Sequence, residues 1–161
     1  MKITLFSIVI SLFTLVWGDS SFTEKRYSYA LDKTTLFKGS VSMNEESTVV
    51  RYVQPERKVL TQTGQQLIIE DVDAHKTQTI DLSDRIDMVL YFSFMRSAYR
   101  KDLSGLKTYF EVEREKNILT LLPKKQVKRA IEKIVMTMNG DEIQKIMINF
   151  TNRDTIEIET H

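Results

Sequence analysis

Apolar and polar side chains alternate along most of this chain, and this period of two residues constrains the fold more than any other feature. In residues 131–138, Ile134, Met136 and Met138 fall on one face of an extended chain. Successive side chains of a strand point to opposite faces, so the pattern predicts strands with one buried face. It predicts ten or eleven strands, at 22–31, 37–43, 48–54, 58–63, 66–71, 76–82, 109–114, 117–122, 131–138, 143–150 and 156–159.

Short turns separate these runs. Asn139-Gly140 predicts a tight hairpin, since both residues accept a positive φ, and Gly64 lies at another turn. Pro55 cannot donate to a sheet and is expected at a strand end or edge. Many strands joined by short turns indicate one antiparallel sheet that curls on itself. We therefore expect a mainly β (α+β) fold, an unclosed antiparallel barrel or strongly curved sheet.

The middle of the chain departs from this period. From Asp84 to Lys101 apolar residues recur every three or four positions, which predicts a helix with Asp84 as its N-cap. Shorter helical turns are expected at 103–109 and from Pro123 to Ala130, with Pro123 in the first helical position. So few helical residues do not fill a broad concave face. The sequence predicts a short helical lid over an apolar cavity, a typical site for a greasy ligand.

Apolar residues of the last strands and of the predicted helix are the candidates for the cavity lining. They are Met88, Leu90, Phe92, Phe94, Met95, Met136, Met138, Ile146, Ile148, Phe150, Ile156 and Ile158. Methionine re-packs around variable shapes, although the same methionines also suit an ordinary core. Periodicity does not reveal which face of the sheet is concave, so these residues are expected either to line a cavity or to belong to an ordinary core.

The N-terminus has the layout of a secretory signal. Lys2 precedes a fourteen-residue run, 3–16, that only Thr and Ser interrupt, and Gly18 ends a possible cleavage site. The run is shorter than the roughly 20 apolar residues of a membrane-spanning helix. We expect residues 1–18 to be a signal peptide and 19–161 to be a single periplasmic domain. The alternative is a retained membrane anchor.

Composition excludes several classes of function. Without Lys2 the chain keeps 22 basic and 22 acidic residues, a balance that argues against nucleic acid as a partner. The absence of Cys excludes disulfides, thiol chemistry and an N-terminal lipid on Cys. The sequence contains neither a nucleophile elbow nor a phosphate loop, so no enzyme and no cofactor are expected. Asp71, Asp73 and His75 alternate, but a solvated hairpin tip explains them better than a metal site.

One basic cluster remains, made of Lys124, Lys125, Lys128 and Arg129. A solvated helix face explains such a cluster. A docking patch for an acidic partner or an anionic membrane leaflet is the functional alternative.

Several short motifs resemble those of the periplasmic lipoprotein carrier LolA and its relatives. The chain begins like the F-x-[QE]-x-[KR] strand of that family with Phe22-Thr23-Glu24-Lys25-Arg26. The other similar segments are Leu36-Phe37-Lys38-Gly39, Pro55, Thr63-Gly64 before Leu67-Ile68-Ile69, Leu103-Ser104-Gly105-Leu106 to Tyr109-Phe110-Glu111-Val112, Leu119-Thr120-Leu121-Leu122-Pro123, and the ending from Gly140 to Ile156. The middle segments resemble the LolA-related branch, and the similarity extends over residues 22–159.

The resemblance implies an unclosed barrel with a helical lid, in which an apolar cavity holds acyl chains in transit. Two departures stand out. Family carriers have a helix before the first strand, whereas Phe22 follows the signal almost directly, so either that helix is missing or segment 3–17 replaces it. The arginine of the family's Arg-Pro pair, which helps to control lid closure, has no counterpart in Asn44 to Val50, and its role is not transferred to Arg51.

The expected function is therefore a periplasmic carrier that shuttles a lipoprotein or another lipid toward the outer membrane. Its expected partners are the acyl chains, an inner-membrane exporter and an outer-membrane acceptor, with the carrier itself a monomer. A non-catalytic adaptor or structural domain that binds another protein through a sheet edge is the alternative.

Overall fold

The computed structural model describes residues 20–161, which form eleven strands and two helices. The predicted signal peptide lies outside the described residues. The strands are β1 (Ser20–Ser28), β2 (Lys33–Met43), β3 (Ser47–Gln54), β4 (Lys58–Thr63), β5 (Gln66–Asp71), β6 (Lys76–Asp81), β7 (Phe110–Glu115), β8 (Ile118–Pro123), β9 (Ile131–Asn139), β10 (Glu142–Phe150) and β11 (Thr155–Thr160). The helices are α1 (Ile86–Arg100) and α2 (Ser104–Lys107). Neither helix is long and apolar enough to cross a membrane, within the described part of the chain.

All strands belong to one antiparallel sheet, in the order β6-β5-β4-β3-β2-β1-β11-β10-β9-β8-β7. Strands that are consecutive in the chain pair with each other, except β6 and β7, which the two helices separate. In addition β1 pairs with β11, which joins the two ends of the described chain in the middle of the sheet. Strands β6 and β7 are the two edges and do not pair with each other, so the barrel is unclosed. The predicted fold class, a mainly β unclosed curved sheet with a short helical cover, is confirmed.

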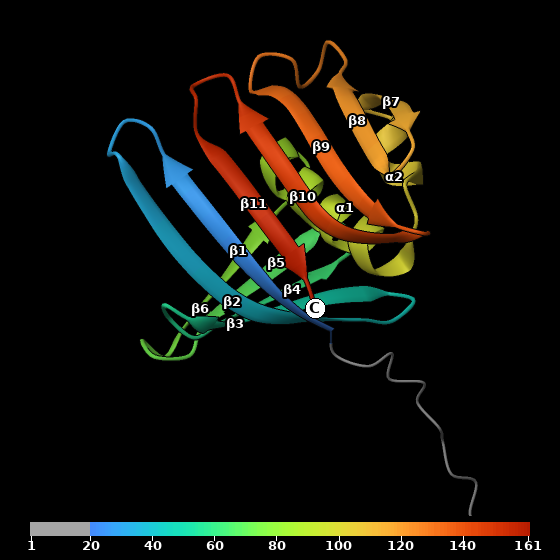
Figure 1. Ribbon diagram of the computed structural model, residues 1–161. Helices are drawn as coiled ribbons and strands as arrows, with labels where there is room; N and C mark the ends of the chain where they lie inside the picture. Colours follow the sequence, from blue (N-terminus) through green and yellow to red (C-terminus); the bar gives the residue numbers. More distant parts are fainter. Residues whose placement is uncertain (1–19) are drawn as a thin grey trace, which may run out of the picture.

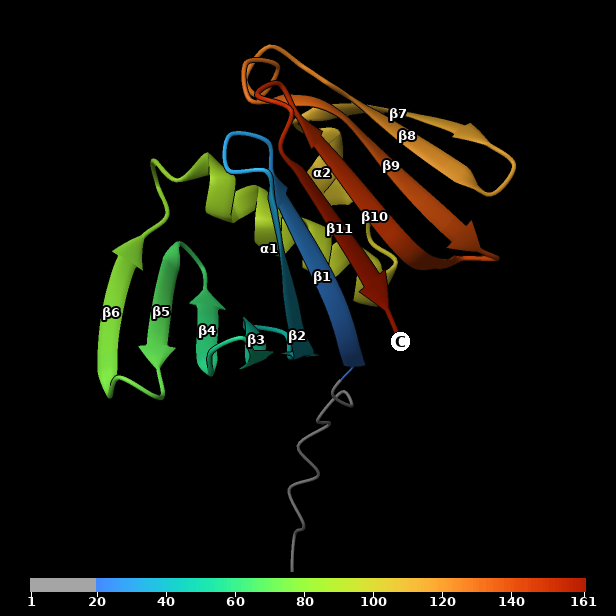
Figure 2. The same ribbon diagram turned by 60° about the vertical axis from the view of Figure 1, so that its left-hand side comes forward.

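The sheet bends so strongly that its β6–β3 part and its β10–β7 part face each other across α1 (Figures 1 and 2). The alternation predicted for residues 131–138 sets the inner face, since Ile134, Met136 and Met138 are buried on it. Helix α1 therefore lies inside the concavity and contacts β10 and α2.

Helix α1 is buried around most of its circumference from Leu90 to Ala98. Its two buried serines cause no unpaired polar groups, because the Ser93 hydroxyl donates to the Val89 carbonyl and the Ser97 hydroxyl to the Phe94 carbonyl. A helix packed in this way fills one end of the concavity with side chains. The C-terminal half of α1 is therefore part of the core.

Three local predictions differ from the structure. The N-cap of α1 is Arg85, without a side-chain cap, because the first helical amide bonds close on the Arg85 carbonyl one residue beyond Asp84. Pro123 ends β8, paired with Phe110, and residues 124–130 form successive turns in place of a helix. In the hairpin after β9, a positive φ is predicted at both Asn139 and Gly140. Asn139 instead pairs with Glu142 as part of the strand, and of the two residues only Gly140 has a positive φ, of 61°.

Strands β4 and β5 have the predicted limits, and the ends of the other strands differ by at most one residue, except in β1 and β2. Strand β2 begins at Lys33, four residues before the predicted start at 37. The first predicted strand extends too far, to residue 31, whereas β1 ends at Ser28. Residues 29–32 form a turn in which Asp32 has a φ of 44°, and this left-handed conformation ends the pairing. The turn leaves Tyr29 and Leu31 exposed at the tip of the β1–β2 hairpin.

Gly39 of β2 has no room for a side chain. A Cβ at this position would collide with the Arg51 carbonyl oxygen and lie 2.9 Å from Cζ of Phe22. Gly39→Ala is therefore expected to lower the free energy of unfolding by about 3 kcal/mol, as overpacking does in a closed site. Chemical denaturation measures the loss.

Gly105→Ala is the matched control for this substitution. A Cβ at Gly105 would have Oγ of Ser93 as its nearest neighbour, at 3.7 Å. Since alanine is a better helix former than glycine, this variant is expected to be as stable as the wild type or slightly more stable. Equal stability of the Gly39 variant and the wild type would contradict the close approach of Gly39 to the Arg51 carbonyl oxygen.

Candidate functional site

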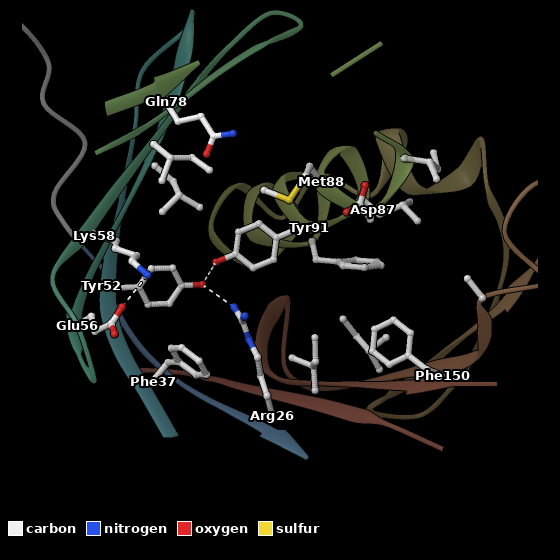
Figure 3. A pocket seen from close by; sticks show the side chains of 18 of the residues that line it. Arg26, Phe37, Tyr52, Glu56, Lys58, Gln78, Asp87, Met88, Tyr91 and Phe150 are labelled. Atoms are coloured by element: carbon white, nitrogen blue, oxygen red, sulfur yellow. Dashed lines mark hydrogen bonds and ion pairs between the residues drawn. The ribbon is translucent and has the colours of Figure 1, made fainter. Parts of the chain in front are cut away.

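A cavity of about 950 Å³ lies between the N-terminal half of α1 and the inner face of the sheet (Figure 3). Strands on both sides of the bend contribute to it, together with α1 and with Gln126, Val127 and Ala130. The lining includes Arg26, Phe37, Tyr52, Leu60, Ile69, Met88, Leu90, Tyr91, Phe94, Val127, Ile148, Phe150 and Ile156. Pockets that hold small ligands have volumes of about 300–1,000 Å³, and this cavity is at the upper end of that range.

The structure divides the twelve predicted cavity residues into two groups. Six line the cavity: Met88, Leu90, Phe94, Ile148, Phe150 and Ile156. The other six, Phe92, Met95, Met136, Met138, Ile146 and Ile158, are buried in the core outside the cavity lining. The C-terminal half of α1 packs against that end of the sheet, which fills the space beside those six residues. Ligand binding by any of the twelve stays a prediction.

Sequence reasoning missed the contribution of β2 to β5. Phe37, Leu60 and Ile69 come from these strands and line the cavity with Tyr52 of β3. The sequence signal for them is weak, because Phe37, Leu60 and Ile69 each directly follow another apolar residue. The sequence does not contain the position of α1, which leaves these strands beside the empty space and only Ile131 of β9 in its lining.

A buried polar cluster links the sheet to α1 at the wall of the cavity. The Glu24 carboxylate on β1 is completely buried and forms an ion pair with Nε of Arg26. It also accepts a hydrogen bond of 3.0 Å from the Tyr52 hydroxyl. Nη2 of Arg26 donates to Oη of Tyr52 over 3.2 Å, and the hydroxyl of Tyr91 on α1 forms a short bond with that of Tyr52 (Figure 3).

The cluster could have been suspected from the sequence. Phe22, Glu24 and Arg26 alternate on β1, so an apolar position, an acid and a base share the inward face. Two charges on a buried face are stable only as a hydrogen-bonded pair. Sequence reasoning treated these residues only as part of a motif and gave them no place in the site.

Burial sets the electrostatics of this cluster. Desolvation lowers the pKa of Arg26, but the neighbouring Glu24 carboxylate outweighs it and the net pKa is raised. Burial also raises the pKa of Tyr52 and that of Tyr91, so both hydroxyls keep their protons. The guanidinium further stacks over the ring of Phe37, with Cζ 4.3 Å from the centroid. The wall therefore presents a neutralised ion pair and protonated phenols.

Alkaline pH is expected to destabilise the protein through these two tyrosines. Since their pKa values are raised above the ordinary value of about 10, the folded state binds more protons than the unfolded state above that pH. The contribution of these two tyrosines to the free energy of unfolding should therefore be constant below about pH 10 and fall above it. Denaturation at a series of pH values measures this fall. Compared with the wild type, the free energy of unfolding should fall less steeply at alkaline pH in Tyr52→Phe/Tyr91→Phe and equally steeply in Tyr29→Phe, which changes an exposed tyrosine. Identical falls in all three proteins would contradict the role of the buried pair.

The acidic residues around the cavity mouth are each held in an ion pair. Nζ of Lys58 lies 2.6 Å from the Glu56 carboxylate and 4.0 Å from that of Asp71, and Arg85 pairs with Asp87 at 2.8 Å. Paired charges at an opening add little net field. The mouth on this side is therefore polar but nearly neutral.

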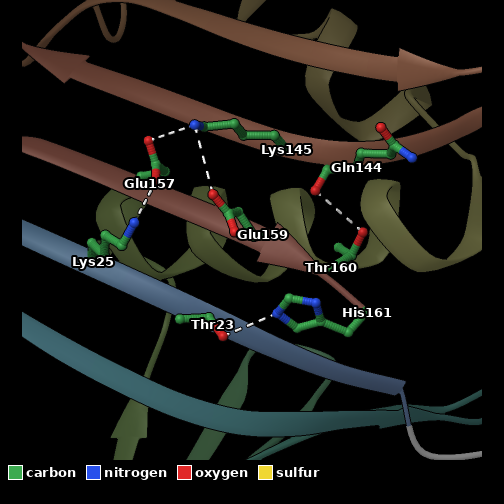
Figure 4. Close-up of polar contacts among 8 residues, drawn as sticks. All are labelled: Thr23, Lys25, Gln144, Lys145, Glu157, Glu159, Thr160 and His161. Carbon is green, nitrogen blue, oxygen red and sulfur yellow. Dashed lines mark hydrogen bonds and ion pairs between the residues drawn. The ribbon is translucent and has the colours of Figure 1, made fainter.

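The outer face of the sheet differs in character from the cavity. Lys25, Lys145, Glu157 and Glu159 form a ladder of ion pairs across β1, β11 and β10, with Lys145 2.8 Å from Glu157 (Figure 4). Hydrogen bonds from the lysines lower the pKa of Glu157, Lys145 contributing most. Beside the ladder, the Thr23 hydroxyl lies 3.0 Å from Nε2 of His161. This face is a solvated surface on the side of the sheet opposite the cavity.

The hairpin that carries Asp71, Asp73 and His75 does not bring them together as ligands. Asp73 pairs with Arg57 at 2.6 Å, and Asp71 accepts the Ala74 amide over 2.9 Å. Residues 20–161 contain no group of three side chains suited to a metal ion.

The predicted docking patch lies beside the cavity. Lys124, Lys125, Lys128 and Arg129 are exposed in the turns between β8 and β9, and Val127 of the same segment is buried against the core and lines the cavity. Nζ of Lys124 donates to the Lys107 carbonyl over 2.7 Å.

Comparisons with known proteins find similarity only in structure. No family model matches the sequence, and no curated protein matches it. A LolA superfamily protein from Nitrosomonas europaea superposes with a TM-score of 0.50 at 10% identity, over 89% of this chain and 83% of that one. A DUF1329 family protein from Desulfovibrio piger superposes with a TM-score of 0.42 at 13% identity, over 89% of this chain and 82% of that one. The chain is thus similar in architecture to a LolA superfamily structure, and its fold is LolA-like.

Proposed function

We propose that the protein is a periplasmic carrier that holds the acyl chains of a lipoprotein or another lipid in its cavity and takes them toward the outer membrane. The proposal includes a signal peptide at residues 1–18, an inner-membrane exporter as donor, an outer-membrane acceptor and a monomeric carrier. The observation that carries it is an apolar cavity of about 950 Å³ inside a LolA-like fold.

The cavity chemistry suits an acyl chain. Most of the side chains that face the space are apolar, and the charged Glu24 and Arg26 neutralise each other. Each buried methylene contributes about 0.8 kcal/mol, so ten of them give roughly 8 kcal/mol, a micromolar affinity. Such an affinity keeps the chain out of water and still allows its release. A solid interior would instead have favoured the adaptor that binds through a sheet edge.

A fluorescent fatty acid tests the proposal. Delipidated protein should bind it saturably, with one affinity in the micromolar range, and an unlabelled fatty acid of the same length should displace it. A short-chain acid of the same head group is the control for binding through charge alone. Fluorescence that rises without saturation, or that the short acid displaces equally well, would overturn the proposal.

A further inference from the structure

Three connections between strands meet at one end of the sheet. They are residues 29–32 between β1 and β2, 124–130 between β8 and β9, and 151–154 between β10 and β11, all at the top of Figure 1. Hydrogen bonds join them. The Thr151 amide donates to the Ala130 carbonyl over 3.0 Å, and the Tyr29 amide donates to the Asp154 carboxylate over 2.7 Å. The three connections therefore form one continuous surface, which we call the docking face.

The docking face is basic although the chain as a whole is nearly neutral. It contains five basic residues (Lys124, Lys125, Lys128, Arg129 and Arg153) and two acidic ones (Asp32 and Asp154), a net charge of +3. Both acids already accept hydrogen bonds, Asp32 from Tyr27 and Asp154 from Tyr29. Within residues 20–161, none of the five basic side chains forms an ion pair. The surface is therefore complementary to an anionic partner.

The same face exposes apolar side chains. Leu31 is 75% exposed, the largest exposure of any large apolar side chain among the described residues, and Tyr29 is 50% exposed. Arg153 lies over the Tyr29 ring at 4.9 Å and donates to its hydroxyl over 2.7 Å. Each of these groups suits one layer of a bilayer. Leu31 suits the hydrocarbon region, the Tyr29 ring suits the interface, and the cations that form no ion pair suit the head groups. A soluble acidic protein would account for the cations but not for Leu31.

A groove of about 480 Å³ lies beside this face, and Leu31, Asn152 and Asp154 of the docking face contribute to its lining. Four of its lining residues, Arg26, Phe37, Phe150 and Ile156, also line the main cavity. The groove and the cavity are therefore neighbouring spaces that share these four side chains as a wall.

We propose that the docking face binds the surface of an anionic lipid bilayer, so that the groove faces the leaflet while the carrier receives or delivers its acyl chains. The role of this contact in lipid transfer rests on the proposed carrier function. The contact itself does not require a ligand in the cavity. Cations attract anionic head groups at about 1 kcal/mol each, and Leu31 adds the apolar insertion.

Vesicle flotation tests the contact. The protein should float with vesicles of phosphatidylcholine and anionic phosphatidylglycerol and not with phosphatidylcholine alone, and salt should weaken the binding because exposed charges are screened. Lys124→Gln/Lys125→Gln should weaken it about 30-fold. Leu31→Ser should also weaken it, which a purely electrostatic contact with an acidic protein would not predict.

Lys38→Gln/Lys116→Gln is the matched control, since it removes the same charge from exposed sites away from the docking face. It also keeps the same N-terminus, so any contribution of residues 1–18 is equal in both proteins. Equal flotation of the two double variants would overturn the proposal. Wild-type protein that does not float with anionic vesicles would also overturn it. In that second case an acidic protein becomes the candidate partner.

Fatty-acid binding in solution separates this inference from the carrier function. The Lys124→Gln/Lys125→Gln variant should bind a fluorescent fatty acid like the wild type, since neither lysine lines the cavity. If the wild type floats with anionic vesicles but binds no fatty acid, the docking face is supported and the carrier function is wrong. If it binds the fatty acid but does not float, the carrier function is supported and the docking face is wrong.

Discussion

Met88→Asp is expected to weaken fatty-acid binding at least about 100-fold while the protein stays folded. Met88 is half-buried, lines the cavity and points into it from α1 (Figure 3). A carboxylate there must lose its water when an acyl chain covers it, a cost of several kcal/mol. As the third residue of α1, the new carboxylate lies near the positive end of the helix dipole, which favours the folded state. Fluorescent fatty-acid titration measures the affinity, and thermal denaturation checks the fold.

Val53→Asp is the control for the new charge. Val53 is 59% exposed on β3 and does not line the cavity. This variant should bind the fatty acid like the wild type, since its charge stays in water. If both variants bind normally, the ligand does not occupy the space beneath α1. If both lose binding together with their fold, the affinity change does not report on the cavity.

Glu24→Ala is expected to lower the free energy of unfolding by about 3 kcal/mol. The substitution leaves the Arg26 guanidinium without its carboxylate in a largely apolar wall, and breaking a buried pair from one side costs about 3–5 kcal/mol. The lower end applies because 42% of the Arg26 side chain is exposed, so water in the cavity can solvate part of the charge. For a domain of this size the melting temperature should fall by roughly 6–12 °C.

Removal of both charges should restore most of this loss. Glu24→Leu/Arg26→Met keeps the volume and leaves no unpaired charge, so its stability should lie close to that of the wild type. Glu142→Ala is the matched surface control, since Glu142 is 72% exposed and pairs with Lys101 at 3.6 Å. It should cost less than about 1 kcal/mol. A Glu24→Ala variant no less stable than Glu142→Ala would contradict the buried cluster.

The sheet could be predicted from the sequence because its information is local. The period of two residues marks β4, β9 and β10, and a turn residue such as Gly64 separates neighbouring runs. The pairing of β1 with β11 has no such local signal, since the two strands lie at opposite ends of the described chain. The likeness to a LolA superfamily structure supports the architecture and reveals nothing about the cargo.

The candidate site could be predicted only in part, because it depends on where α1 rests. Periodicity predicts that Met136 and Ile146 lie on the apolar faces of their strands, without saying that these faces are concave. Both residues are buried, and α1 fills the space beside them. The cavity instead lies next to Phe37 and Tyr52 of β2 and β3. The position of a helix inside a concavity follows from contacts between distant segments, which no single stretch of sequence records.

Mass spectrometry of lipids that co-purify with the protein tests most directly whether the cavity holds acyl chains. The wild type purified from its native envelope should carry a lipid or an acylated protein in a fixed ratio to the chain, and the Met88→Asp variant from the same envelope should have lost it. Wild-type protein without any acylated species, or equal amounts in both proteins, would contradict the carrier function.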